Sequence, residues 1–312
     1  MKALRFFACL CVSTLSIAVT TPALGLANHV FVSARSGNNA NSCDNVKTPC
    51  LTFAGAVTQL NPDGEVIVLD SGSYGPVTIT QGVTIEASAG VTAFIHPPSG
   101  DAITVNAALT DKVTLRGLTL TVGANNGITA NSVGTLNVEN CFITGFSSAG
   151  IVMLSAGRLN VKGTDIKAGV IGVHLANNAG VVQASIDHCH LDGNTAGFVA
   201  ETMETGSSST TATCTTANNN RSIGWVCGNG TSGKDVLNLE FCTGSENGHD
   251  GLLGDSTNAL SIARYSNCVF ANNGFYGVGQ SHSGSVETRG NNTITGNGTA
   301  PTFGVIGSFS PM

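Results

Sequence analysis

The feature that most constrains this chain is a repeat of about 25 residues, which is a period typical of solenoids. When the repeats are aligned, one column holds mostly small or apolar residues: Leu118, Cys141, Thr164, Cys189, Cys214, Cys242, Cys268 and Asn292. A second column, eight to twelve residues later, holds only glycine: Gly127, Gly150, Gly172, Gly197, Gly224, Gly251, Gly277 and Gly304. The nearly constant offset between the columns indicates that one structural unit recurs along the chain.

The local pattern identifies the unit. Around the first column alternate residues are apolar, as in Ile186, Cys189 and Leu191, which is typical of strands. The residue before that column is usually of a type that tolerates positive φ: it is Gly117, Asn140, Gly163, His188, Thr213, Phe241, Asn267 and Asn291. Each repeat therefore predicts a strand, a one-residue bend, a second strand, a loop and a third strand. We expect an all-β, right-handed parallel β-helix of about 9–10 coils.

In such a solenoid, equivalent residues of successive coils stack ~4.8 Å apart. The pattern therefore predicts a buried file of free thiols at Cys141, Cys189, Cys214, Cys242 and Cys268. Trp225 follows a column glycine, and we expect it to lie in the core.

The N-terminal segment differs from the repeats. Residues 1–27 have the features of a signal peptide, because Lys2 and Arg5 precede an apolar run and small residues follow it. They predict a secreted protein, periplasmic or extracellular, and no later segment is apolar enough to span a membrane. Residues 28–65 are expected to form a cap, with a short amphipathic helix at 51–60 and strands following at 66–69, 77–80 and 83–87. The β-helix is expected over residues 66–312.

Cys43 and Cys50 lie in a loop-like stretch where a local disulfide closes easily. A zinc site is the alternative, although no second cysteine pair at ligand spacing accompanies them. At the other end, residues 304–312 are too short to cover the last coil. Exposed strand edges there would allow self-association.

The charge balance argues against nucleic acid as a partner. The chain has 13 Lys and Arg and 19 Asp and Glu, a net charge of −6, and no Lys/Arg cluster. Phosphate binding requires concentrated positive charge.

These repeats resemble pectin-lyase-like right-handed β-helix proteins. The opening Phe31-Val32-Ser33, Ser36-Gly37-Asn38, Ser42-Cys43 and Thr48-Pro49-Cys50-Leu51-Thr52-Phe53-Ala54-Gly55-Ala56 is similar to secreted bacterial right-handed parallel β-helix repeat proteins of unassigned activity. The wider fold includes pectate lyases, polygalacturonases and epimerases, so the resemblance implies a polysaccharide or cell-surface glycan as partner but assigns no activity. In its enzymes the catalytic groups cluster on the first sheet.

The strand after each column glycine should belong to that sheet. Its first outward residues would be Thr129, Val152, His174, Val199, Val226, Leu253, Gly279 and Ile306. This row contains one histidine and no carboxylate. Cleavage of a polysaccharide requires paired carboxylates or a base with cationic groups, so the row does not predict an active site. Partial motifs at Gly163-Thr164-Asp165 and Gly248-His249-Asp250-Gly251 are interpreted as turns.

Two groups of polar residues remain as candidate sites. Asp187, His188, His190 and Asp192 lie close together, either as an acid/base or metal site or as solvated strand and turn residues. Arg116, Glu139, Lys162 and Asp187 share one outward column, either as an ion ladder or as a sugar-binding cleft.

Three hypotheses follow. The first is a secreted, non-catalytic scaffold that binds carbohydrate or another surface through an exposed apolar stripe, with residues 201–213 as a covering insertion and with no metal or cofactor. The second is a divergent polysaccharide lyase or glycoside hydrolase that uses Lys162, Asp187, His190 and Asp192, with Ca²⁺ only in the lyase case. The third is a structural or adhesive protein that associates through its open C-terminal end.

Overall fold

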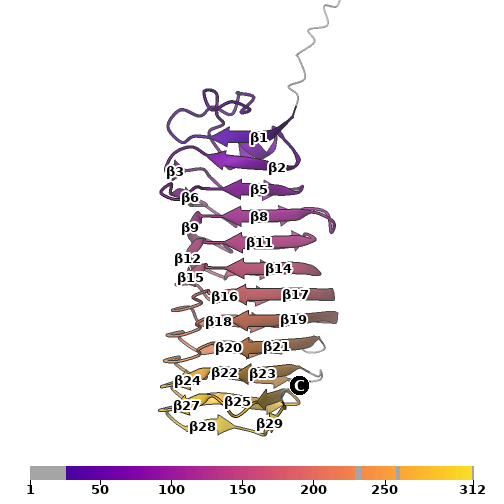
Figure 1. The fold of residues 1–312 in the computed structure, drawn as a ribbon, viewed down its shortest axis with the longest axis vertical. Helices are drawn as coiled ribbons and strands as arrows, with labels where there is room; N and C mark the ends of the chain where they lie inside the picture. The colour runs from indigo at the N-terminus through magenta and orange to yellow at the C-terminus, as the bar shows by residue number, and fades with distance from the viewer. Residues whose placement is uncertain (1–25, 229–232, 258–260, 311–312) are drawn as a thin grey trace, which may run out of the picture.

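The computed structural model describes residues 26–228, 233–257 and 261–310. The chain winds into a stack of coils along one axis, and every strand pairs in parallel with the equivalent strand of the next coil (Figure 1). In these ranges the sheets contain 12, 10, 5 and 2 strands, and a single short helix lies near the start of the described chain. The predicted all-β solenoid of about 9–10 coils is confirmed.

The 12-stranded sheet runs the whole length of the described chain. Its strands, in spatial order, are β1 (Ala27–Val32), β2 (Leu60–Val68), β5 (Val83–Glu86), β8 (Lys112–Arg116), β11 (Thr135–Glu139), β14 (Gly157–Lys162), β17 (Ala179–Asp187), β19 (Thr205–Thr213), β21 (Lys234–Glu240), β23 (Ile262–Ser266), β26 (Ser285–Thr288) and β29 (Ile306–Ser308).

The 10-stranded sheet follows the column glycines. Its strands are β4 (Val77–Ile79), β7 (Ile103–Asn106), β10 (Ile128–Ser132), β13 (Ala149–Met153), β16 (Ile171–Leu175), β18 (Ala196–Ala200), β20 (Ile223–Cys227), β22 (Leu252–Ser256), β25 (Tyr276–His282) and β28 (Ala300–Phe303).

Shorter strands complete each coil and form what we call the third face. They are β3 (Gly72–Ser73), β6 (Ala93–Ile95), β9 (Leu118–Gly123), β12 (Phe142–Phe146) and β15 (Asp165–Lys167), and then β24 (Val269–Ala271) and β27 (Thr293–Thr295). Isolated bridges through His190, Thr216 and Thr243 join these two sets.

The one-residue bends lie between the 12-stranded sheet and the third face. Asn140, Gly163 and His188 have φ of 51°, 56° and 51°, as the sequence predicted. The prediction was wrong by one residue at Cys214, which has φ 48° and is exposed. Because β19 extends to Thr213, the bend comes one residue later, and Thr215 Oγ1 accepts a hydrogen bond from Cys189 N at 3.2 Å. The predicted bend at Asn291 was also wrong, since positive φ falls on Gly290.

The thiol file is therefore interrupted. It consists of Cys141, Cys189, Cys242 and Cys268, all buried and free, with threonines at the intervening coils. Burial raises the pKa of the Cys141 thiol to about 12 and that of Cys189 to about 11, so these two thiols are protonated and inert at neutral pH.

The glycine column is required by close packing between coils. A Cβ at Gly150 would lie 2.8 Å from the Gly172 carbonyl oxygen, which no side chain tolerates. The prediction fails only at the last coil, where Pro301, and not Gly304, stands opposite Gly277. Ile306 consequently belongs to β29 of the 12-stranded sheet. The outward position next to Gly279, which was predicted for Ile306, is occupied by Phe303.

A file of asparagines, which the sequence analysis did not identify, supports the last five coils. The side-chain oxygen of the first member, Asn194, accepts a hydrogen bond from Gly169 N at 3.0 Å, and that of each later member accepts one from the backbone N–H of the preceding asparagine, at 2.8–3.0 Å. Four members are buried, namely Asn194, Asn220, Asn247 and Asn273, and the last, Asn297, is half-buried. Trp225 packs beside this file in the core, fully buried, and its Nε1 donates to Thr243 O at 2.8 Å.

The first coils carry the predicted disulfide and a helix that is shorter than expected. Cys43 and Cys50 form the disulfide. Helix α1 spans Phe53–Val57, not residues 51–60, because β2 already begins at Leu60. Thr52 caps the helix by accepting from Gly55 N at 3.0 Å.

The 12-stranded sheet extends further toward the N-terminus than the boundary at residue 66, since β1 and β2 belong to it. The predicted leader, residues 1–27, lies outside the described residues up to residue 25, and β1 begins at Ala27. Within the described ranges, no helix is both long and apolar enough to cross a membrane.

Candidate functional site

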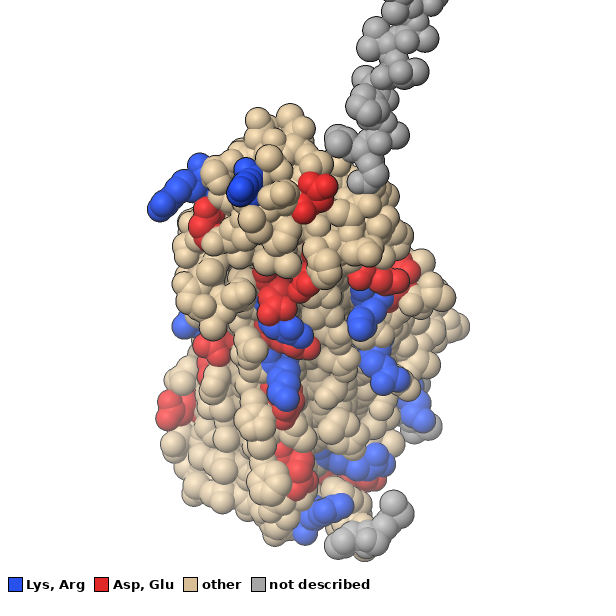
Figure 2. Space-filling view, turned by 45° about the horizontal axis from the view of Figure 1, so that its top comes forward, with Lys and Arg blue, Asp and Glu red and all other residues tan. Residues whose placement is uncertain are grey.

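The outward side of the 12-stranded sheet, which we call the charged face, carries rows of Lys, Arg, Asp and Glu along the solenoid (Figure 2). Alternation points every second residue of each strand outward, and the register aligns these residues in columns. Arg116, Glu139, Lys162 and Asp187 occupy one column in consecutive coils, as predicted.

The members of this column are partly paired. Arg116 donates to Glu86 and Glu139, each at 2.9 Å, and the Glu139 hydrogen bond raises the pKa of its guanidinium. Lys162 Nζ is 4.0 Å from the carboxylate of Asp187. Asp187 accepts from Thr213 Oγ1 at 2.8 Å, which is the main cause of its lowered pKa. Asp187 therefore stays ionised and has the character of a structural anion.

A second column beside it is neutral. Asn160 Nδ2 donates to Asn137 Oδ1 at 2.8 Å, and Asn137 Nδ2 donates to Thr114 Oγ1 at 3.0 Å. The third column holds Lys112 and, two coils on, Arg158. Among the described residues no carboxylate lies within 4.0 Å of either cation, and Arg158 donates only to Gln183 Oε1, at 3.0 Å.

We define the central patch as the outward residues of β8, β11, β14 and β17. It contains four cations and two carboxylates: Lys112, Arg116, Arg158, Lys162, Glu139 and Asp187. A hollow of about 480 Å³ opens at its N-terminal end, beside Lys112 and Arg116. A shallow one of about 100 Å³ lies between Arg158 and Gln183.

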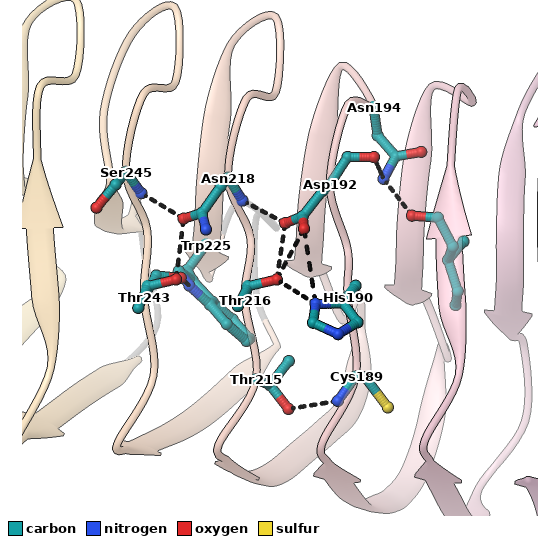
Figure 3. Close-up of polar contacts among 11 residues, drawn as sticks. Cys189, His190, Asp192, Asn194, Thr215, Thr216, Asn218, Trp225, Thr243 and Ser245 are labelled. Carbon is teal, nitrogen blue, oxygen red and sulfur yellow. Dashed lines mark hydrogen bonds and ion pairs between the residues drawn. The ribbon is translucent and has the colours of Figure 1, made fainter. Parts of the chain in front are cut away.

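His190 and Asp192 lie on the third face (Figure 3). They follow the bend at His188, whereas Asp187 ends strand β17 just before it. Thr216 Oγ1 is 3.0 Å from His190 Nδ1 and within 2.9 Å of both carboxylate oxygens of Asp192. Asp192 also accepts from Asn218 N at 2.7 Å.

The next coil repeats this arrangement, since Asn218 Oδ1 accepts from Thr243 Oγ1 at 2.9 Å and from Ser245 N at 2.8 Å (Figure 3). Because the contacts recur with neutral side chains, they stabilise the stacking of coils. The four predicted catalytic residues form two pairs: Lys162 with Asp187 at 4.0 Å, and His190 with Asp192 at 3.8 Å. Among the described residues, no hydrogen bond or ion pair joins one pair to the other.

The apolar stripe lies on the outer side of the 10-stranded sheet, in the predicted register through Gly279. It is not exposed, because Val152, Val199 and Val226 show only 5–6% of their surface. Side chains stacked one coil apart shield each other. The expected cover at residues 201–213 is also wrong, since Thr205–Thr213 is strand β19 of the other sheet.

Titratable pairs that the sequence analysis missed flank this stripe. His174 Nε2 is 3.5 Å from Glu201, and burial lowers the pKa of the imidazole. His282 Nδ1 is 2.7 Å from Asp255. Glu201 lies two residues beyond Val199, and Asp255 lies two residues beyond Leu253. Extending the alternation by one step would have found both carboxylates.

Within the part of the chain that the structure describes, no three or more His, Cys, Asp or Glu side chains are grouped so that they could hold a metal ion.

Comparison with known proteins supports the fold. Residues 60–207 match the family model described as "Right handed beta helix region". Pectate lyase Pel9A is similar in structure, with 15% identity, a TM-score of 0.56, and coverage of 88% of this chain and 80% of the other. The A-module of mannuronan C-5 epimerase AlgE4 from Azotobacter vinelandii shows 13% identity and a TM-score of 0.47, over 80% of this chain and 91% of the other.

No curated protein sequence matches the chain significantly. The in-register stacking, the family model and the likeness to pectate lyase agree with one another. The protein has the fold of a right-handed parallel β-helix.

Proposed function

We propose that this protein is a non-catalytic scaffold whose central patch binds an anionic polysaccharide. The observation that carries the proposal is the concentration of four of the eleven Lys and Arg beyond residue 25 in four successive strands, in a chain of net negative charge. Excess positive charge on one surface favours an anionic partner.

The spacing of the cations suits a linear polymer. Lys112 and Arg158 stand in one column two coils apart, which places their Cα atoms about 10 Å apart along the axis. The columns run along the solenoid, so a chain laid parallel to the axis would meet cations and amide groups repeatedly. Carboxylate groups repeated along a polysaccharide are a matching ligand.

We infer that the protein acts outside the reducing cytosol. The Cys43–Cys50 disulfide is characteristic of oxidising compartments, and the leader expected at residues 1–27 would direct export. Export of the full-length chain in a bacterial host, with cleavage detected by mass spectrometry, tests this point.

Binding to polygalacturonate, measured by affinity electrophoresis and calorimetry, tests the main proposal. The double variant Lys112→Ala/Arg158→Ala should weaken binding at least tenfold. A matched control, Lys47→Ala/Lys167→Ala, removes the same charge elsewhere and should bind like the native protein. Raising the salt from 50 to 200 mM should weaken native binding, because exposed charges are screened. Equal affinities of the two double variants would contradict the proposal.

A glycoside hydrolase on the 10-stranded sheet is the second candidate. It is favoured by Glu201 and Asp255, two carboxylates at equivalent positions of this sheet. They directly follow Ala200 and Gly254, which occupy the same register position two coils apart. The Cα atoms of the two carboxylates are therefore about 10 Å apart. Inverting hydrolases hold their carboxyl groups about 6.5–9.5 Å apart. A lyase would also need cationic groups, and the ten strands of this sheet contain no Lys or Arg.

Reducing-end release from a panel of neutral and acidic polysaccharides tests this candidate. A hydrolase would release sugars, and Glu201→Gln would abolish the release while leaving binding to polygalacturonate intact. No release from any polymer would reject it.

A further inference from the structure

Four rings near the C-terminal end of the 10-stranded sheet form a surface that we call the aromatic shelf: His249, Phe275, Tyr276 and Phe303. His249 stacks on Phe275 with centroids 4.1 Å apart and planes 16° apart. Tyr276 stacks on Phe303 with centroids 5.0 Å apart and planes 25° apart. The chain has few aromatic residues, only 5%, so two exposed stacks in adjacent coils are a marked concentration.

The shelf is open to solvent. Phe275 is 45% exposed and Phe303 is 49% exposed, whereas the valines of the neighbouring stripe are buried. Phe275 N donates to His249 O, and Thr299 N donates to Phe275 O, so these residues follow one another in a column. His249 covers one face of the Phe275 ring. The next residue of the column is Thr299, which has no ring, so the opposite face of the Phe275 ring stays uncovered by an aromatic side chain. A flat ligand ring can continue the stack there.

The polar groups around the shelf define the ligand. In the part of the chain that the structure describes, neither the Tyr276 hydroxyl nor His249 Nε2 makes a hydrogen bond, so both can bind the hydroxyl groups of a ligand. Two carboxylates, Asp250 and Asp255, lie at the shelf. No strand of this sheet contains Lys or Arg. Arg221 stacks on Gly248 one coil before His249, on the side of the shelf away from Phe275 and Phe303.

We propose that the aromatic shelf is a second binding site, specific for neutral polysaccharides, in which pyranose rings stack on Phe275 and Phe303. An aromatic face offers apolar area to the C–H face of a sugar, and the polar rim meets its hydroxyl groups. Uronate and phosphate groups are disfavoured at Phe275 and Phe303, because the carboxylates of Asp250 and Asp255 would repel them and Arg221 lies at the opposite edge of the shelf, beyond His249. The site lies on a different sheet from the central patch, so the protein would join a neutral glycan to an anionic one.

The test measures binding to galactomannan, glucomannan, xyloglucan and mixed-linkage β-glucan by calorimetry, with saturation-transfer NMR to identify the rings that contact the sugar. Native protein should bind at least one of them, and Phe275→Ala/Phe303→Ala should weaken that binding at least tenfold, equivalent to about 1.4 kcal/mol. Phe94→Ala, an exposed phenylalanine of the third face, is the control and should have no effect.

Binding to polygalacturonate separates this site from the central patch. The shelf variant should bind polygalacturonate like the native protein, whereas Lys112→Ala/Arg158→Ala should lose only that ligand. Failure to bind any of the four neutral polysaccharides, or unchanged binding in the shelf variant, would overturn the proposal without affecting the first one.

Discussion

The asparagine file predicts a large, local loss of stability when one member is removed. Asn247 Oδ1 accepts hydrogen bonds from the backbone N and the side-chain Nδ2 of Asn220, at 2.9 and 3.0 Å. Asn247→Ala would leave both buried donors without this acceptor. An unsatisfied buried donor costs about 1–3 kcal/mol, so the expected loss in the free energy of unfolding is about 4 kcal/mol.

Trp225 provides the assay. It is the only tryptophan in the sequence, and it is buried. The residue before it, Gly224, packs against the Asn247 side chain so closely that a Cβ there would lie 2.9 Å from Asn247 Nδ2. Urea unfolding followed by its fluorescence should show a midpoint lower by about 1 M, if the denaturant dependence is about 3 kcal/mol/M. Far-ultraviolet circular dichroism of the same samples reports whether the other coils unfold with this one.

The control is Asn238→Ala. Asn238 lies on the charged face and makes one long hydrogen bond, to Thr210 O at 3.4 Å. Its removal should cost less than about 0.5 kcal/mol, as surface substitutions usually do. Equal losses for the two variants, or a loss below about 1 kcal/mol for Asn247→Ala, would refute the reasoning.

Other predictions concern charge, covalent structure and assembly. Burial raises the pKa of Asp235, which accepts a hydrogen bond from Ser208 Oγ at 2.6 Å. The native protein therefore keeps a proton on Asp235 that the unfolded chain loses above pH about 4, so this group should lower the free energy of unfolding as the pH rises. Thermal melts at pH 4–8 should show this fall, and Asp235→Asn should flatten it. Cys43→Ser/Cys50→Ser should lower the free energy of unfolding by about 2–3 kcal/mol, the value for a loop this short, and an unchanged melting temperature would contradict it. The adhesive hypothesis predicts concentration-dependent association through the edge strands β28 and β29. Charged side chains protect sheet edges from pairing, and the sequence has none after Arg289. A monodisperse monomer in sedimentation at high concentration would argue against the hypothesis.

The fold could be predicted because the same geometric requirement recurs in every coil. Close contact between coils requires glycine at positions such as Gly172, and the bend favours asparagine or glycine, as at Asn140. The errors have two different causes. One additional residue before the bend moved Cys214 out of the core. In the last coil the loop has the usual length, but Pro301 occupies the glycine position, so the search for a glycine led to Gly304.

The candidate sites were less predictable, because residue order does not show which side chains are shielded. Alternation gave the outward direction of Val199 and Val226 correctly, but their burial depends on neighbours stacked from other coils. The pairing of Phe275 with His249 depends likewise on which loop residues become adjacent, and nothing in their local sequence signals it.

Lysine footprinting on polygalacturonate tests the central claim most directly. The protein is acetylated with and without the polymer, and the modification of each lysine is read by mass spectrometry. Binding at the central patch predicts protection of Lys112 and Lys162, with Lys47 and Lys167 modified equally in both samples. Equal modification of all four lysines under saturating polymer, or protection confined to Lys47 and Lys167, would contradict it.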